Sequence, residues 1–252
     1  MCRHVGYVGP AVPLSRLLYD PPNSLEHQSW APADMRAGGT INADGFGVGW
    51  YPASGADPVR YRRDRPMWTD VGFAGLAGTV RAGAMLASVR SATVGMPVVE
   101  TAVAPFTGGR WLFSYNGAIR GWPHAVSELA ARLPVTDLIQ LDAPTDAALL
   151  WALVWHRLRA GADMATAVEE VVLQVAEAAP GSRLNLMLTD GDTIVATTWT
   201  HSLAVHVASD AVTVASEPLH GDGDWRSVPD RHLVVARPSD VDIRPLRSGD
   251  AS

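Results

Sequence analysis

A chain of 252 residues, 47% of them apolar and 18% charged, is long enough to bury a hydrophobic core within one domain. Its formal net charge of −6 argues against a nucleic-acid-binding surface, and its single cysteine excludes a disulfide framework or a cysteine-rich zinc site. All basic residues are arginine, so lysine-dependent Schiff-base and Walker-type phosphate-loop chemistry is excluded. No run approaches the ~18 apolar residues of a membrane span and no signal-peptide core is present, so we expect a cytoplasmic protein that binds neither nucleic acid nor membrane.

Strand-like segments dominate the chain. Short apolar runs bounded by turn residues predict strands at His4–Val8, Phe46–Tyr51, Met85–Arg90, Trp111–Asn116, Leu184–Asp190, Thr193–Trp199, Leu203–Val207, Val212–Glu217 and His232–Ala236. The short, turn-like links Asp190-Gly191-Asp192 and Ser209-Asp210 predict an antiparallel meander for the second half. Gly45, Gly47 and Gly49 alternate, which is typical of a strand packed close to another backbone.

Helical periodicity is strongest in two segments. The first is Asp146–Ala160, for which Thr145 is a suitable N-cap, and the second is Met164–Ala178, which follows Asp163. Weaker patterns predict helices at Pro13–Leu18, Met67–Thr79 and Ala125–Leu133. On the first helix, core-like spacing indicates packing roles for Trp151, Trp155 and His156. We therefore expect a layered α+β fold in a single domain over residues 2–247, with a frayed polar tail at 248–252.

Cys2 is the most informative residue of the chain. Trimming of the initiator methionine would place a thiol and a free α-amine on one residue, and an amine with a pKa of ~7.7–8.0 can act as general base for its own thiol. The alternative is an inert buried thiol, because free cysteines are often buried.

Three further positions carry possible chemistry. Arg90 ends a strand and could hold a carboxylate through two hydrogen bonds, or could make a surface salt bridge. Asn116-Gly117 is first a turn signal, but an amide side chain and a neighbouring backbone N–H also suit an oxyanion hole. Asp146 could complement the helix dipole or bind a substrate ammonium group. The eight histidines are scattered without ligand spacing, so no metal is expected.

In this order, the four features resemble the class II glutamine amidotransferase family of N-terminal-nucleophile amidohydrolases. The resemblance implies a four-layer αββα sandwich of two antiparallel sheets flanked by helices, and no cofactor. It implies that Cys2 is the nucleophile and that Asn116 and Gly117 stabilise the oxyanion. It also implies that Arg90, with Thr93, holds the α-carboxylate of a γ-glutamyl substrate and that Asp146 holds its α-ammonium group.

The resemblance extends over nearly the whole chain. The segments MCRHVGYVG, NADGFG, RSATVGMP, SRLN, ATTW, SEPL and VPDRHL resemble stand-alone γ-glutamyl amidohydrolases of ergothioneine biosynthesis. Synthase-linked members of the family usually have histidine where this chain has Ser88, Val94 and Ala104. These differences lie around the expected glutamyl cradle and argue against glutamine as the substrate.

Two other functions remain open from the sequence. One is the glutaminase subunit of a two-chain amidotransferase, although no acceptor domain follows in this chain and a hydrolase would need none. The other is a catalytically silent glutamyl-binding protein, which would not need Cys2. A small-molecule substrate is expected in each case, and a homo-oligomer is possible. If the leaving half of the substrate is cationic, aromatic or acidic side chains could hold it; the candidates are Trp30, Trp50, Trp68 and Asp44.

Overall fold

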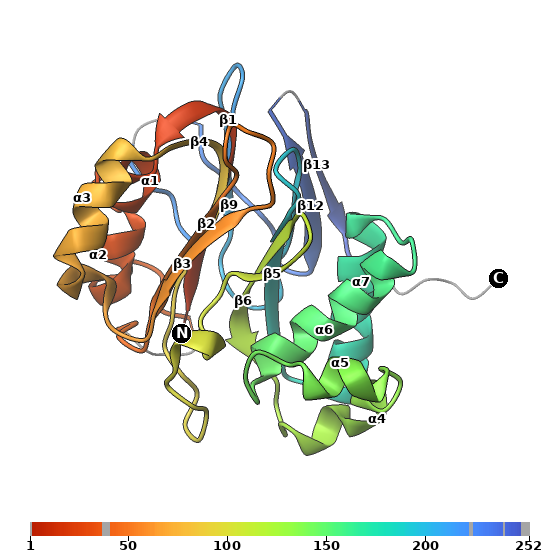
Figure 1. The fold of residues 1–252 in the computed structure, drawn as a ribbon. Coiled ribbons are helices and arrows are strands. Elements are labelled where there is room, and N and C mark those ends of the chain that lie inside the picture. Colours follow the sequence, from red (N-terminus) through yellow and green to blue (C-terminus); the bar gives the residue numbers. More distant parts are fainter. Residues whose placement is uncertain (1, 37–40, 222–223, 239, 248–252) are drawn as a thin grey trace.

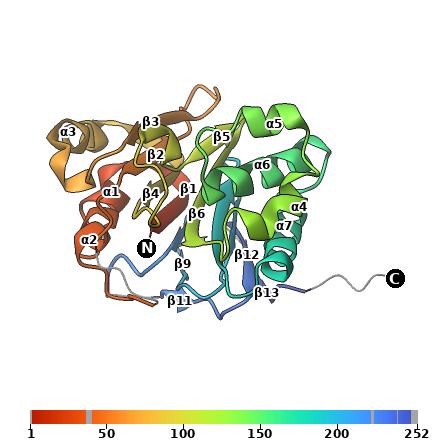
Figure 2. The same cartoon turned by 90° about the horizontal axis from the view of Figure 1, so that it is seen from below.

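A computed structural model describes residues 2–36, 41–221, 224–238 and 240–247; Met1 and the expected frayed tail at 248–252 lie outside this set. Two antiparallel sheets face each other, and helices cover the outer face of each, as expected for the αββα sandwich (Figure 1). Seen from below, α1 (Ser15–Leu18), α2 (Leu25–Trp30) and α3 (Val71–Thr79) lie on one side (Figure 2). The opposite side carries α4 (Ser127–Ala130), α5 (Val135–Ile139), α6 (Asp146–Arg159) and α7 (Met164–Ala178).

The first sheet has seven strands in the order β11-β9-β10-β1-β4-β2-β3. Their bounds are β1 Arg3–Pro13, β2 Phe46–Trp50, β3 Val59–Arg63, β4 Arg81–Val89, β9 Ala204–Val207, β10 Val212–Ala215 and β11 Arg226–Ser227. The chain therefore starts in the middle of this sheet, where Arg3 pairs with Val89 of β4 and Val5 pairs with Ala215 of β10. A central strand has hydrogen-bonding partners on both sides, which fixes its register firmly.

The second sheet has six strands in the order β13-β12-β8-β7-β6-β5. Their bounds are β5 Phe106–Gly108, β6 Trp111–Ala118, β7 Arg183–Thr189, β8 Ile194–Thr197, β12 His232–Arg237 and β13 Asp240–Pro245. Within β6, alternate residues face opposite layers: Leu112 packs in the core between the sheets, whereas Phe113 and Tyr115 pack against the helices. This alternation decides which side chains of β6 face the other sheet.

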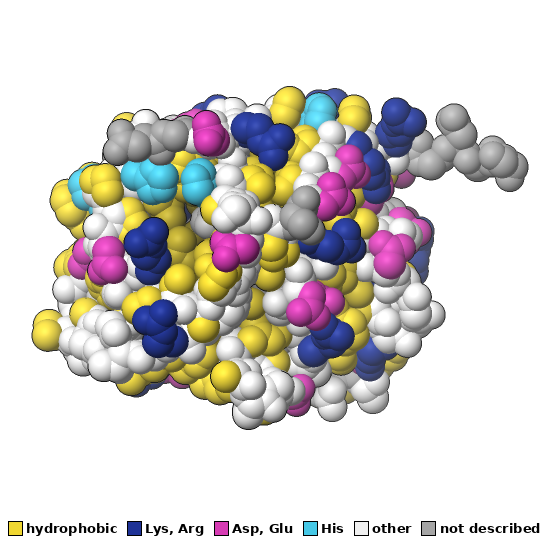
Figure 3. All heavy atoms as spheres, turned by 90° about the horizontal axis from the view of Figure 1, so that it is seen from above, with side chains coloured by type: hydrophobic (Ala, Val, Ile, Leu, Met, Phe, Trp, Pro, Cys, Tyr) yellow, Lys and Arg dark blue, Asp and Glu magenta, His cyan; other side chains and the backbone are white. Residues whose placement is uncertain are grey.

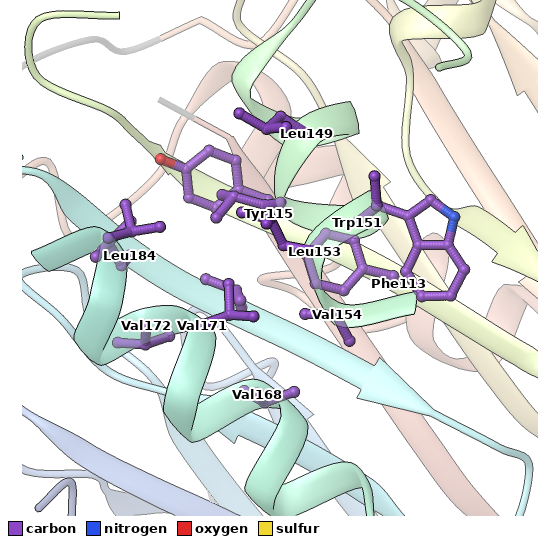
Figure 4. Packing of buried hydrophobic residues seen from close by; sticks show 14 of the residues in the cluster. Phe113, Tyr115, Leu149, Trp151, Leu153, Val154, Val168, Val171, Val172 and Leu184 are labelled. Carbon is purple, nitrogen blue, oxygen red and sulfur yellow. The ribbon is translucent and has the colours of Figure 1, made fainter. Parts of the chain in front are cut away.

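Three hydrophobic cores correspond to the three interfaces between the layers. Phe46 and Phe73 belong to the core under α1–α3, and Leu86 and Met187 belong to the core between the sheets. The third core lies between the second sheet and α6 and α7, where Phe113, Tyr115, Trp151, Val171 and Leu184 gather (Figure 4). Because α6 is anchored over its whole length by this packing, its N-terminus is held in a fixed place.

Every predicted strand and helix overlaps an observed one, but the meander expected for the second half is wrong. The pairs β7–β8 and β9–β10 are antiparallel neighbours, yet the first pair belongs to the six-stranded sheet and the second to the seven-stranded sheet. Turn residues predict which strands pair locally, but the choice of sheet depends on distant partners. His156 also differs from its expected packing role, because its side chain is 41% exposed near Asp137.

Glycines on β2 allow the close approach that their alternation predicts. A Cβ atom on Gly47 would lie 2.2 Å from the carbonyl oxygen of Ala104, and one on Gly49 would lie 2.7 Å from Leu112. Gly45 has a φ of +133°, a conformation that other residues rarely adopt. The segment before β5 therefore lies directly against β2.

Two surface properties complete the description. Seen from above, basic, acidic and apolar side chains are interspersed over the face of the molecule (Figure 3). Among the described residues, no helix combines the length and the apolar character needed to cross a bilayer.

Candidate active site

A pocket opens beside the start of β1 and brings together residues from four separate parts of the chain. It encloses about 480 Å3 of empty space, part of it open to solvent. Of the six residues expected at the site, Cys2, Arg90, Thr93, Gly117 and Asp146 line this pocket. They come from the residue before β1, the loop after β4, strand β6 and the N-terminus of α6.

Cys2 is half-buried and directly precedes β1. Its Sγ lies 3.8 Å from the carbonyl oxygen of Ser91. Alternation along β1 places Cys2 on the same side as His4, whose ring Nδ1 lies 3.3 Å from Ser114 Oγ of the opposite sheet. The thiol is therefore held near the edge of the space between the two sheets.

Arg90 follows the last residue of β4, and its backbone is fixed by Gly45 and Asp44. Its N–H donates to the carbonyl of Gly45 at 2.7 Å, and its carbonyl accepts from the N–H of Asp44 at 3.0 Å. The carboxylate of Asp44 accepts a further hydrogen bond from the N–H of Ala92 at 2.7 Å. Within the described residues, Arg90 Nη1 is buried without a hydrogen-bond partner. A buried guanidinium nitrogen that lacks a partner is suited to binding an anion.

Asp146 is the first residue of α6, where Thr145 caps the helix by accepting a hydrogen bond from the N–H of Ala148 at 3.2 Å. The two carboxylate oxygens of Asp146 accept from the N–H groups of Ala147 at 2.9 Å and Ile119 at 3.2 Å. Burial raises the pKa of Asp146, although these N–H groups and the charge of Arg90 act in the opposite direction. A cationic group in the pocket would favour the ionised form.

Asn116 lies inside β6, paired with Asn185 of β7, and not in the turn that Asn-Gly normally indicates. Strand alternation directs its side chain between the sheets with Ser114, away from the side of Tyr115 and Gly117. Both polar atoms of its amide are buried and lack a hydrogen-bond partner among the described residues. Asn116 is not one of the described residues that line the pocket, whereas Gly117 is.

The remaining wall is mostly small or apolar and was not predicted from the sequence. Besides the expected residues it includes Ser91, Ala92, Met96, Ala102, Phe106, Tyr115, Thr145 and Ala147. Of the three positions that differ from synthase-linked enzymes, Ser88 and Ala104 line the pocket, and Ser88 Oγ donates to the carbonyl of Ala104 at 2.8 Å. Val94 is fully exposed, so its expected place beside the glutamyl cradle is not supported.

The candidates for holding the leaving half of a substrate are not in this pocket. Among the described lining residues, Trp30, Trp50, Trp68 and Asp44 are all missing. The side chains of Trp30 and Trp68 are exposed, and Trp50 packs against the core under α1–α3. Among the described residues, no group of three or more His, Cys, Asp or Glu side chains could hold a metal ion.

Comparison with known proteins gives consistent matches. The family model described as class II glutamine amidotransferases matches residues 23–209. A γ-glutamyl-hercynylcysteine sulfoxide hydrolase from Mycolicibacterium smegmatis is 40% identical over 247 residues, which is 98% of this chain and 100% of the relative.

Solved structures agree at the level of the fold. A glutamine aminotransferase class-II domain protein from Silicibacter pomeroyi has a TM-score of 0.70 at 22% identity, and the match covers 98% of this chain and 100% of that one. Glutamine phosphoribosylpyrophosphate amidotransferase from B. subtilis has a TM-score of 0.71 at 14% identity, over 98% of this chain and 49% of that one.

Proposed function

Because this chain belongs to the class II glutamine amidotransferase family, we propose that it hydrolyses the γ-glutamyl amide bond of γ-glutamyl-hercynylcysteine S-oxide. The products are glutamate and hercynylcysteine S-oxide, an intermediate of ergothioneine biosynthesis. The observation that carries the proposal is a single pocket lined by a thiol, a guanidinium group and a carboxylate. Identity of 40% over the full length of a hydrolase of that name supports the choice of substrate.

The pocket carries charges that match both ends of a glutamyl α-carbon. Arg90, with Thr93 beside it, binds the α-carboxylate, and Asp146 binds the α-ammonium group. The unpartnered Nη1 of Arg90 and the raised pKa of Asp146 are the two properties expected of such groups before the substrate arrives. The γ-amide then extends toward Cys2.

The reaction proceeds in two steps through a thioester. The α-amine of Cys2 takes the thiol proton, and the thiolate attacks the γ-carbonyl carbon. Asn116 Nδ2 and the Gly117 N–H stabilise the oxyanion, after which the proton passes to the leaving nitrogen and the C–N bond breaks. Water then attacks the thioester, and glutamate and the free thiol are released.

The chemistry requires a free amine on Cys2, so Met1 must be removed. We expect the active protein to be lighter than the full 252-residue chain by one methionine. Intact-mass measurement of an active preparation checks this directly. Retention of Met1 in fully active protein would contradict the proposed base.

The substrate proposal is tested by mass spectrometry of products from a panel of γ-glutamyl compounds. The panel contains γ-glutamyl-hercynylcysteine S-oxide, γ-glutamylcysteine, glutamine, and an analogue of the first compound with its α-carboxylate amidated. We expect kcat/KM to be highest for the first compound and much lower for glutamine, because Ser88 and Ala104 leave space in the pocket where synthase-linked members usually carry histidine. The amidated analogue leaves Arg90 unpaired and should be hydrolysed far more slowly.

Cys2→Ala provides the control for the panel. It should abolish hydrolysis and retain substrate binding by calorimetry, since Arg90 and Asp146 do not depend on the thiol. If glutamine is the best substrate, or a partner protein is required, the chain is instead the glutaminase subunit of an amidotransferase. Wild-type turnover by Cys2→Ala would eliminate the thioester mechanism.

A further inference from the structure

The proposed nucleophile occupies an unusual place, since it precedes the first residue of a strand at a chain end. Terminal residues fray unless other groups tie them down. Nucleophilic attack needs the reacting atoms about 3–3.5 Å apart and aligned, so a frayed Cys2 would be a poor nucleophile. The next residue, Arg3, makes the contacts that restrain it.

Arg3 is 1% exposed, which is rare for an arginine, and each nitrogen of its guanidinium group has a partner. Nη1 donates to the carbonyl oxygen of Cys2 at 3.1 Å, and Nη2 donates to the carbonyl oxygen of Asp34. Nε donates to Glu217 Oε1 at 3.0 Å. One planar group therefore joins the nucleophilic residue to two distant segments.

Glu217 is 2% exposed and lies just after β10, the strand that pairs with β1. Besides Arg3, its carboxylate accepts hydrogen bonds from the N–H groups of Ala33 at 2.9 Å and Asp34 at 3.1 Å. The side chain of Asn23 lies 3.4 Å from Oε2. These contacts fix the carboxylate, and through it the guanidinium group that holds Cys2.

Stability alone is a weak reason for such a pair. Removing two charges from water costs several kcal/mol per ion, and well-packed apolar residues often replace a buried ion pair without loss of stability. An arginine that donates to the carbonyl of the nucleophilic residue has a second use. Because the peptide bond itself is planar, holding this oxygen limits rotation about the Cα–C bond of Cys2.

We propose that Arg3 and Glu217 are positioning residues that hold Cys2, its α-amine and its thiol, in the geometry needed for attack. The inference rests on the proposed function, since it assigns them to the same site. Neither residue lines the described pocket, so both act through Cys2 and leave substrate binding to Arg90 and Asp146.

The first test separates kcat from KM in Arg3→Met, Arg3→Lys and Glu217→Gln. We expect Arg3→Met to lower kcat by about 100-fold, the loss that a displacement of ~1 Å can cause, with KM changed less than threefold. Lysine can pair with Glu217, but its single nitrogen cannot reach the three separate partners of the planar guanidinium group. Arg3→Lys should therefore recover much of the melting temperature and little of kcat. Full recovery of kcat by lysine, or a loss confined to KM, would overturn the proposal.

Arg244→Met is the matched control. Arg244 forms a two-point ion pair with Glu169, at 2.9 and 2.6 Å, between β13 and α7, and neither residue lines the pocket. Its loss should lower the melting temperature and leave kcat within about twofold of wild type. An equal fall of kcat in Arg244→Met would show that general destabilisation explains the effect.

A second readout does not depend on the substrate. Cys2 is the only cysteine, so iodoacetamide labels one thiol in the chain. We expect the labelling rate of Arg3→Met to move at least threefold from the wild-type rate toward that of a short peptide with the same N-terminal sequence. Arg244→Met should keep the wild-type rate. An unchanged rate in Arg3→Met overturns the positioning role, even if no γ-glutamyl compound proves to be a substrate.

Discussion

The buried amide of Asn116 supplies a sharp test of its proposed role. An oxyanion donor acts mainly in the transition state, so Asn116→Ala should lower kcat by ~10²–10³ and change KM little. Steady-state kinetics measures both constants. Ser114→Ala is the control, since Ser114 faces the same way on β6 but lies two residues further from Gly117, and it should keep most of kcat. An unchanged kcat in Asn116→Ala would leave Asn116 with only a structural role.

The raised pKa of Asp146 predicts two opposite effects of pH. The folded state holds the proton more tightly than the unfolded chain, so the stabilisation from this group is present at low pH and is lost as pH rises from 3.8 through the raised pKa. Binding of an α-ammonium group needs the carboxylate, so KM should rise as pH falls through the same pKa.

Asp146→Asn tests both effects. This variant should bind substrate weakly at every pH. Urea unfolding at several pH values should show that its free energy of unfolding no longer contains the pH-dependent contribution of Asp146. A wild-type KM that stays constant as pH falls to 4 would contradict the assignment of Asp146 to the ammonium group.

Most of the site could be predicted at the level of single residues. The family that the chain resembles predicts Cys2, Arg90, Thr93, Gly117 and Asp146 at one site, and the fold gathers them in one pocket. Their catalytic roles remain predictions. The partnership of Arg3 with Glu217 could not be predicted, because the two are 214 positions apart and neither sits in a pattern that indicates a buried charge.

Among the glycines that the structure describes, Gly117 of β6 leaves the least room for a Cβ atom. A Cβ atom on Gly117 would lie 1.9 Å from the carbonyl oxygen of Arg183 in β7, and a backbone atom cannot move without separating the strands. Gly117→Ala should lower both the melting temperature and kcat.

The control is Gly75→Ala in α3, where a Cβ atom meets nothing within 4 Å. Thermal unfolding should show that this substitution stabilises the protein by about 0.5–1 kcal/mol. If Gly117→Ala has the melting temperature of wild type, the close approach of Gly117 to the carbonyl of Arg183 is not needed for stability.

Two physical reasons explain why the sequence patterns missed β3, β5, α2 and α5. Strand β3 reads Val-Arg-Tyr-Arg-Arg and lies at a sheet edge, where charged residues are normal, so it lacks the apolar pattern of a strand. Strand β5 has only three residues, and α2 and α5 have six and five. Short elements form because tertiary packing holds them in place, which local patterns do not record. The sequence predicts the long helices α6, with Thr145 as its N-cap, and α7, directly after Asp163, because their signals are local.

At the scale of the whole molecule, buried histidines should make the fold sensitive to mild acid. Burial, with the charge of Arg3 adding to it, lowers the pKa of His4 to about 3. Burial, with the charges of Arg183 and then Arg3 adding to it, lowers the pKa of His201 to about 4. Both are neutral in the folded protein, whereas the unfolded chain takes up protons below pH 6.5. As pH falls from 6.5 toward the pKa of the folded state, each histidine therefore lowers the free energy of unfolding by up to ~1.4 kcal/mol per pH unit.

Urea unfolding between pH 7 and 4.5 measures this loss. His201→Gln should show a shallower dependence on pH than wild type, because one of the two proton-binding groups is gone. His232→Gln is the control, since His232 is only partly buried and its Nδ1 lies 2.8 Å from the carbonyl of Asp230. Wild-type protein that is as stable at pH 4.5 as at pH 7 would contradict neutral burial of these two rings.

The central place of β1 has a consequence for the order of events during synthesis. This strand is made first, but its neighbour β10 and the restraining Glu217 lie more than 200 residues later in the chain. At ~5–20 residues per second, roughly 10–40 s pass before the ribosome has made them. Throughout that interval the first residues have no complete sheet to enter and stay open to the aminopeptidase that trims nascent chains. We therefore expect removal of Met1 to be complete before folding encloses Cys2.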